Sequence, residues 1–252
     1  MGQRYYFLHI PKTAGTSLMR WIADSGQYNI CPEGLWSLLL ARPRESLREF
    51  TLFCGHFYRY LGAYLNEPLN TFTFLRNPFD RALSHYEHVR RDGHHYFHER
   101  VKSQGSLLAF LKDPVTRPLV ENFQVRSLSA VFEPVALFSK LDLNQDHKYF
   151  LERYLETADT GLQDSTALTL AKDFLSRCVF VGIAERMQES VTKLARVLSI
   201  PAERHVERLN VNPAGTSIES LGRDEWYAMA ELLQADWELY EFALGAFRDF
   251  ES

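Results

Sequence analysis

The chain is poor in cysteine and has no long apolar run. Its 252 residues include three cysteines, Cys31, Cys54 and Cys178, which are far apart and form no CxxC pair. An odd number of widely spaced cysteines argues against a disulfide framework and against a zinc knuckle. No segment approaches the roughly 20 consecutive apolar residues that a membrane-spanning helix needs. We therefore expect a protein of a reducing compartment without a transmembrane segment.

The first residues show no signal-peptide pattern, and the chain has no excess of positive charge. The first residues, MGQRYYFLHIPK, do not combine a basic start with the long apolar stretch of a signal peptide. We therefore expect a cytoplasmic protein. The net charge is -4, whereas a general nucleic-acid binder is usually strongly basic. We expect no nucleic-acid partner, and any anion site must be local.

The apolar residues that are present predict an α/β fold. Hydrophobic residues make up 46% of the chain and charged residues 24%, which is ordinary for a globular protein, and the length suits a single domain over 1–252. Near-continuous apolar runs of strand length, separated by segments with helical spacing, are typical of parallel strands buried on both faces. We predict a P-loop-like fold of three layers, with a central, mostly parallel β-sheet flanked by helices. The predicted strands are 5–10, 51–54, 71–75 and 179–183.

Helices are predicted between and after these strands. In RNPFDRALSHYEHVRR, Asn77 can cap a helix and Pro78 can occupy its first position. Apolar side chains recur on one face of this helix. Its opposite, polar stripe carries Arg81, Ser84, His88 and Arg91. Further helical patterns cover 185–198, 223–250 and much of a middle region at 99–176.

The segment HIPKTAGTS, residues 9–17, joins the first predicted strand to the first predicted helix. Such a turn presents backbone N–H groups and the positive end of a helix to an anion. Lys12 adds a full positive charge, and Thr16 and Ser17 add hydroxyl donors. The GxxxxGK[ST] pattern of nucleoside triphosphatases is not met, because Lys12 precedes Gly15. The segment is a candidate phosphate-binding loop, and an ordinary strand-to-helix turn with a solvated lysine is the alternative.

A second anion-binding position follows the third predicted strand. FTFLRNPFDRALSHY places Arg76 at the end of that strand and Ser84 about two turns into the next helix. Ligands of open α/β sheets bind beyond the carboxyl ends of the strands, so both side chains are expected near the first loop. A triphosphatase would need a magnesium-binding aspartate at such a strand end, whereas an arginine binds phosphate oxygens. The pattern therefore favours a nucleotide that is phosphorylated at two separate places.

HIPKTAGTS and LRNPFDRALSHY resemble the 5′-phosphosulfate and 3′-phosphate motifs of sulfotransferases that use 3′-phosphoadenosine-5′-phosphosulfate (PAPS). The resemblance is to the branch with the heparan sulfate 2-O- and 6-O-sulfotransferases and their bacterial relatives. It implies transfer of a sulfuryl group from PAPS to an acceptor hydroxyl, on a carbohydrate or carbohydrate-like molecule, without a metal. It also implies that Arg76 and Ser84 hold the 3′-phosphate, supported by Arg81. The residues that it places around the 5′-phosphosulfate are Lys12, Thr13, Ala14, Gly15, Thr16 and Ser17.

Other segments resemble the family more weakly. TLFCGHFYRYL has a glycine-histidine pair where relatives carry the catalytic base, which implies that His56 takes the acceptor proton while Lys12 stabilises the leaving phosphate. ENFQVRSLS contains Gln124 and Arg126, and NVNPAGTS, residues 210–217, stands where a family loop closes over PAPS. The sequence leaves open whether these residues contact the donor or the acceptor. The middle region at 99–176 is mostly unmatched, so we expect it to shape the acceptor site.

Several alternatives stay open at this point. A P-loop nucleotide kinase would share the sheet and the loop but would require ATP and magnesium, and a noncatalytic nucleotide- or glycan-binding module would retain the fold without turnover. His56 can also be a structural histidine that bonds to backbone. A cluster of histidines suggests zinc, but HYEH is not HExxH and no cysteine accompanies it, so we expect no metal. The cluster consists of His85, His88, His94, His95 and His98.

Overall fold

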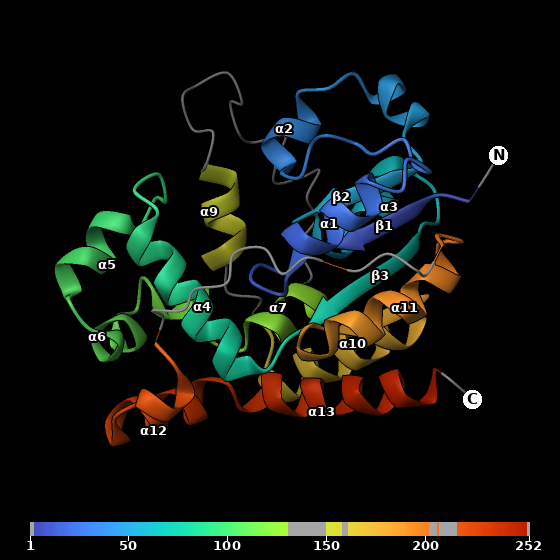
Figure 1. The fold of residues 1–252 in the computed structure, drawn as a ribbon. Coiled ribbons are helices and arrows are strands. Elements are labelled where there is room, and N and C mark those ends of the chain that lie inside the picture. The colour runs from blue at the N-terminus through green and yellow to red at the C-terminus, as the bar shows by residue number, and fades with distance from the viewer. Residues whose placement is uncertain (1–2, 131–149, 158–160, 202–205, 207–215, 251–252) are drawn as a thin grey trace.

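The protein is described here from a computed structural model. The structure describes residues 3–130, 150–157, 161–201, 206 and 216–250 (Figure 1). Part of the predicted helical middle region at 99–176 lies outside these residues. Within the described part of the chain, no helix combines the length and the apolar character that crossing a membrane requires.

Four strands form one sheet in the order β2-β1-β3-β4, and every pairing is parallel. This arrangement confirms the predicted α/β fold; each strand overlaps a predicted apolar run, although β1 ends two residues before the predicted run 5–10 does. Because the strands are parallel, their carboxyl ends meet at one edge of the sheet. The loops that carry the candidate site all begin at this edge. The strands are β1 Tyr5–Leu8, β2 Leu52–Gly55, β3 Asn70–Leu75 and β4 Phe180–Ile183.

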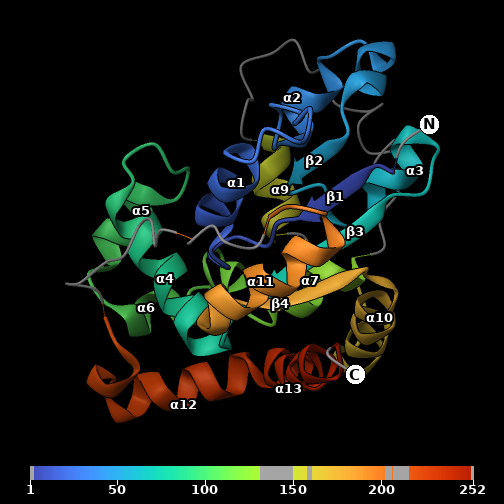
Figure 2. The ribbon, with the colours of Figure 1, turned by 45° about the vertical axis from the view of Figure 1, so that its right-hand side comes forward.

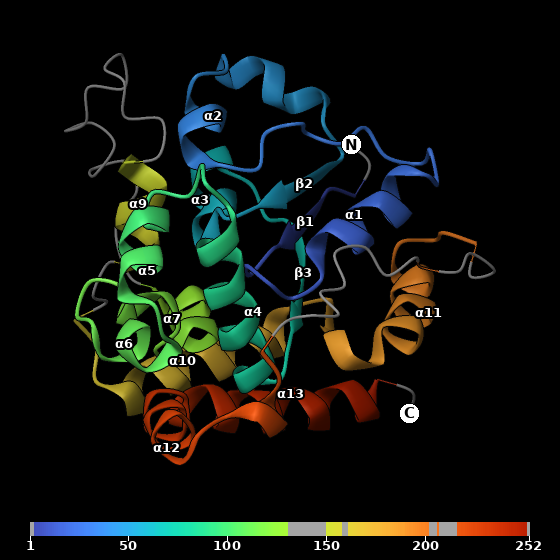
Figure 3. The same cartoon turned by 60° about the vertical axis from the view of Figure 1, so that its left-hand side comes forward.

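Helices cover both faces of the sheet. Alternate residues of β1 point to opposite faces: the Tyr5 hydroxyl donates to the carbonyl of Val197, and the Tyr6 hydroxyl donates to the carbonyl of Tyr58. Figure 3 shows α1 and α11 on one side of the strands and α7 on the other. Both α11 and α13 contact the edge strand β4 (Figure 2). The helices are α1 Gly15–Ala23, α2 Trp36–Leu40, α3 Leu61–Leu65, α4 Pro78–Arg91, α5 His98–Gln104, α6 Leu107–Lys112, α7 Phe123–Ser129, α9 Phe150–Thr157, α10 Asp164–Arg177, α11 Met187–Val197, α12 Arg223–Leu232 and α13 Gln234–Asp249.

The helix predicted after β3 forms as expected. The side chain of Asn77 accepts hydrogen bonds from the amides of Phe79 and Asp80, and Pro78 is the first helical residue. This cap satisfies two of the amides that have no partner inside the helix. It fixes the start of α4 directly after Arg76, at the carboxyl edge of the sheet.

The helical pattern at 223–250 forms two helices instead of one. α12 ends at Leu232 and α13 begins at Gln234, without a proline or glycine at the break. The side chain of Asn122 accepts from the amides of Ala235 and Asp236, and its own amide donates to the Leu232 carbonyl. Asn122 therefore caps the end of α12 and the start of α13, and it satisfies backbone groups that would bond to each other in one continuous helix.

Buried apolar residues form two clusters. The larger one surrounds the sheet and contains Phe7, Phe72 and Phe180. The smaller one lies between α4, α5, α6 and α12, and Trp237 packs against both. Nothing in the packing divides the described residues at an exposed linker, and the single domain over 1–252 stays a prediction.

Candidate active site

The loop between β1 and α1 has a constrained backbone. Lys12 has a φ of 72° and Ala14 a φ of 67°, so two residues with a side chain lie in the left-handed region. Each such residue costs about 1–2 kcal/mol, and strain of this kind is concentrated at functional sites. Thr13, between them, is fully buried, and its hydroxyl donates to the Ile10 carbonyl at 2.8 Å. The loop is thus held in one unusual conformation.

The amino end of α1 is suited to an anion. Its cap residue, Ala14, makes no side-chain hydrogen bond to the helix, and the first turn contains no acidic side chain. The first amides of the helix and its positive dipole end are therefore not neutralised by the helix itself. Thr16 is exposed at this end, whereas Ser17 is buried. The sequence motif therefore forms the predicted strand, loop and helix start.

Gly15 is required by a close approach of His9. A Cβ atom at position 15 would lie 2.1 Å from Nε2 of His9, far inside van der Waals contact. The His9 ring in turn stacks on Phe7, with 5.3 Å between ring centroids. The glycine therefore lets the first turn of α1 pack directly on the histidine that begins the motif.

Positive charge gathers around the loop. Burial lowers the pKa of Lys12, and the nearby guanidinium groups of Arg76, Arg91 and Arg81 lower it further. The carboxylate of Asp92 acts in the opposite direction and raises the pKa of Lys12. These cations repel one another near the amino end of a helix. An anion with several negative charges would relieve that repulsion and bind there.

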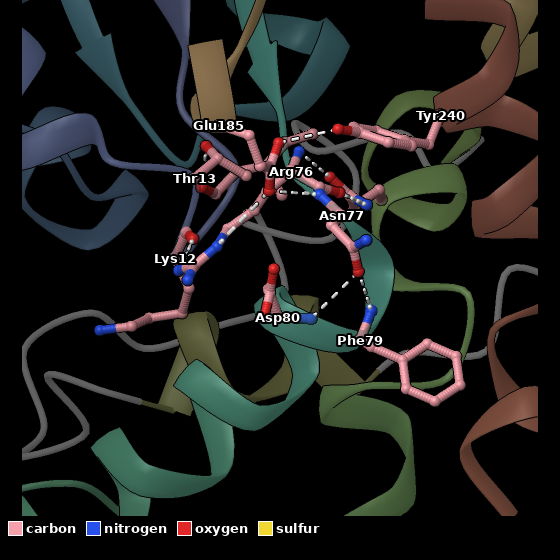
Figure 4. A network of polar contacts seen from close by, with 10 residues as sticks. Lys12, Thr13, Arg76, Asn77, Phe79, Asp80, Glu185 and Tyr240 are labelled. Atoms are coloured by element: carbon pink, nitrogen blue, oxygen red, sulfur yellow. Dashed lines mark hydrogen bonds and ion pairs between the residues drawn. The ribbon is translucent and has the colours of Figure 1, made fainter. Parts of the chain in front are cut away.

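Arg76 connects the second predicted position to the first. Its Nη1 donates to the Lys12 carbonyl at 3.1 Å, and its Nε lies 4.0 Å from a carboxylate oxygen of Glu185. Figure 4 shows the Lys12 side chain pointing away from Arg76 while the backbone carbonyl faces it. Glu185, which follows β4, also accepts from the Asn77 amide and the Tyr240 hydroxyl. The structure therefore brings the loops after β1, β3 and β4 together.

Ser84 and Arg81 occupy different surroundings on α4. Ser84 is half-buried and shares a helical face with His88 and Arg91, which lie near Lys12. Arg81 is fully buried; its Nη2 donates to the Leu119 carbonyl at 2.7 Å. Arg81 therefore lies on the predicted polar stripe, but the fold buries this end of it.

Buried Arg81 is held by few hydrogen bonds. Its guanidinium lies over the Phe123 ring at 4.6 Å, and burial lowers its pKa to about 10. Its Nε and Nη1 atoms have no hydrogen-bond partner among the residues that the structure describes. Because Arg81 is buried, it could support the 3′-phosphate only without direct exposure to solvent. That role stays a prediction.

His56 is hydrogen-bonded to the phosphate-binding motif itself. It follows β2 directly, and its Nδ1 lies 2.7 Å from the His9 carbonyl oxygen. Because a carbonyl can only accept, the neutral ring carries its proton on Nδ1 and keeps a lone pair on Nε2. Burial lowers the pKa of His56, so the ring is neutral at physiological pH. The geometry gives His56 the tautomer of a general base.

A small recess lies beside His56, and the roughly 250 Å³ of empty space there includes open solvent. Apolar and aromatic side chains make up most of its wall, and Glu156 contributes a carboxyl group whose pKa burial raises to about 7. Glu156 comes from α9, which packs against α2 (Figure 1). Sequence reasoning missed Glu156, because nothing in its local pattern distinguishes it from a solvated glutamate of an amphipathic helix. The lining residues are Leu35, Trp36, His56, Tyr58, Leu155 and Glu156.

The weaker sequence matches take positioning roles in the structure. The side chain of Gln124 accepts from the Arg76 amide at 3.0 Å and donates to the Arg76 carbonyl at 2.8 Å. Arg126 donates to the carbonyls of Pro118 and Glu156. Most of the segment 210–217 lies outside the described residues, but Thr216 donates to Glu87 at 2.9 Å.

A family model described as the sulfotransferase family matches residues 3–224. The match covers most of the chain, and the chain belongs to this family. It includes the loops after all four strands and ends near the start of α12. A search of curated proteins finds no match. Family membership favours sulfuryl transfer over the phosphotransferase alternative.

Proposed function

We propose that the chain transfers the sulfuryl group of PAPS to an acceptor hydroxyl by in-line displacement. The observation that carries this proposal is the hydrogen bond between Nδ1 of His56 and the carbonyl of His9. It ties a neutral base to the first residue of the phosphate-binding motif. A base in this position adjoins both the donor loop and the recess that we assign to the acceptor.

The donor half of the site would hold the two ends of PAPS. The loop amides, Lys12 and the hydroxyls at the start of α1 would contact the 5′-phosphosulfate. Arg76 and Ser84 would contact the 3′-phosphate. Negative charge grows on the leaving phosphate oxygen during transfer, and Lys12 with the loop amides would stabilise it. The accumulation of cations beside an uncapped helix end supports this assignment.

The acceptor half would use His56 to remove the hydroxyl proton. Its Nε2 carries the lone pair, and a neutral ring accepts a proton without first losing one. We further propose a carbohydrate or carbohydrate-like acceptor, no metal requirement and no nucleic-acid partner. A cytoplasmic location and a single domain over 1–252 belong to the same proposal.

The donor assignment predicts metal-independent binding of adenosine 3′,5′-bisphosphate. In titration calorimetry we expect this bisphosphate to bind more tightly than ATP with magnesium. Arg76→Ala should weaken its binding about tenfold or more, because a charge-assisted hydrogen bond is worth about 1.5–3 kcal/mol. Arg48→Ala, at an exposed position, serves as the matched control and should change the affinity less than twofold. A preference for ATP with magnesium would contradict the assignment and favour a kinase.

A further inference from the structure

Three side chains from separate segments meet beside the recess. His85 lies on α4, His95 follows that helix, and Glu156 lies on α9; one nitrogen or oxygen atom of each lies within 4.8 Å of the others. His85 is only 2% exposed, and neither of its ring nitrogens has a hydrogen-bond partner among the described residues. A buried polar group without a partner costs about 1–3 kcal/mol, so this cluster is built to meet a polar ligand.

The hydrogen-bonding capacity of the cluster is defined by its neighbours. Nδ1 of His95 accepts from the Phe97 amide at 3.1 Å, so the proton of the neutral ring is on Nε2, which is a donor. The hydroxyl of Tyr96 donates to one carboxyl oxygen of Glu156 and leaves the other oxygen to a ligand. Neutral His85 adds one N–H donor and one lone pair. The cluster therefore combines ring N–H donors with a carboxyl acceptor.

A hydroxyl group matches this set, and a metal ion does not. The three atoms lie within 4.8 Å of one another. A single ligand atom placed among them can therefore lie within 4.8 Å divided by the square root of three, about 2.8 Å, of all three, which is a hydrogen-bond length. A hydroxyl oxygen accepts two N–H bonds and donates its own proton to the carboxylate. A metal would need the lone pair of neutral His95, which is on Nδ1 and already accepts from the Phe97 amide. Arg81 and Lys12 also act on His85 and would repel a cation.

The cluster shares one residue, Glu156, with the proposed acceptor site. Glu156 lines the same recess as His56, and Leu35, Trp36 and Leu155 contribute apolar side chains to its wall. We propose that His85, His95 and Glu156 bind a second hydroxyl of the acceptor, and that the site thereby selects polyhydroxylated acceptors over those with one hydroxyl. This inference rests on the proposed function, because it assigns the recess to the acceptor.

The test compares ligands of similar ring size with many hydroxyls and with one. Methyl glycosides of glucose, galactose and N-acetylglucosamine and, separately, cyclohexylmethanol are titrated by NMR into the full chain saturated with adenosine 3′,5′-bisphosphate. We expect at least one glycoside to bind at least tenfold more tightly than cyclohexylmethanol, because a site built to bond a hydroxyl rejects an analogue without it. His85→Leu should remove this preference and leave binding of cyclohexylmethanol and of the bisphosphate within twofold.

Two further variants make the result specific. Glu156→Gln keeps the volume of the side chain and should weaken the glycoside severalfold, whereas His94→Leu, at an exposed histidine, should change nothing. Glycosides that bind no better than cyclohexylmethanol, or equally well to His85→Leu, would overturn the inference. Zinc chloride binding in calorimetry that His85→Leu abolishes would also overturn it, in favour of a metal site. Bisphosphate binding is measured separately, so failure of the donor site is distinguishable from failure of this subsite.

Discussion

Replacing His56 by alanine is expected to lower kcat for sulfuryl transfer by about a hundred- to ten-thousand-fold, the usual contribution of a general base. The affinity for adenosine 3′,5′-bisphosphate should stay within a fewfold. The substitution leaves the backbone intact, since the His56 amide donates to the Gly34 carbonyl independently of the side chain. Transfer of sulfate from PAPS to an accepted hydroxyl compound and calorimetry with the bisphosphate measure the two quantities.

The pH dependence of the parent protein is part of the same prediction. A base acts only when it is deprotonated, and burial lowers the pKa of His56 below its ordinary value of 6.5. We therefore expect kcat at saturating acceptor to fall only on the acidic side of pH 6.5 and to be level through neutral pH. An acid limb near pH 7 in kcat/KM alone would report acceptor binding by Glu156, whose pKa is about 7, whereas the same limb in kcat would point to Glu156 as the base. A profile that needs protonation near pH 7 for activity would exclude His56 as the base.

His94→Ala is the control for this experiment, because His94 is exposed in the loop after α4. Its activity and pH profile should match those of the parent protein. If His56→Ala retains more than about a tenth of the parent kcat, the histidine is structural and holds the loop through the His9 carbonyl. The proposed acceptor chemistry would then need another base.

The sequence predicted the sheet and the donor loops because both depend on local patterns. Apolar runs such as 71–75 are visible without knowledge of the fold, since a strand buried on both faces tolerates few polar residues. The motif 9–17 and Arg76 lie at strand ends, and parallel topology alone places such residues together. The hydrogen bond from Arg76 to the Lys12 carbonyl agrees with that expectation.

The parts that sequence reasoning missed depend on contacts between distant segments. Arg81 has the polar character of a surface stripe, yet Phe123 and the Leu119 carbonyl hold it inside. The break between α12 and α13 is made by Asn122, more than a hundred residues earlier in the chain. Glu156 meets His85 only in the folded chain, because α9 and α4 are far apart in the sequence, so a histidine spacing rule could not find the cluster.

Gly15→Ala tests whether the packing of the phosphate-binding loop and the position of His56 depend on each other. The new Cβ would lie 2.1 Å from Nε2 of His9, and the His9 ring is held between Phe7 and His56, with centroids at 5.3 and 4.8 Å. Because the ring has little room to move, we expect the free energy of unfolding to fall by about 1–3 kcal/mol, as overpacking usually costs. We expect kcat/KM to fall at least about a hundredfold, since a displacement near 1 Å has such an effect.

A second substitution separates this steric cause from a general loss of stability. His9→Ala removes the ring atoms that the new Cβ would strike but keeps the backbone carbonyl that accepts from His56. In thermal and urea unfolding, the double variant should therefore be less destabilised than the sum of the two single variants. Its bisphosphate affinity should recover relative to Gly15→Ala. Gly93→Ala, where a Cβ meets nothing within 4 Å, should behave like the parent protein. Additive effects in the double variant would show that substitution at Gly15 acts independently of His9. The hypothesis that the donor loop and the base are coupled through His9 would then be wrong.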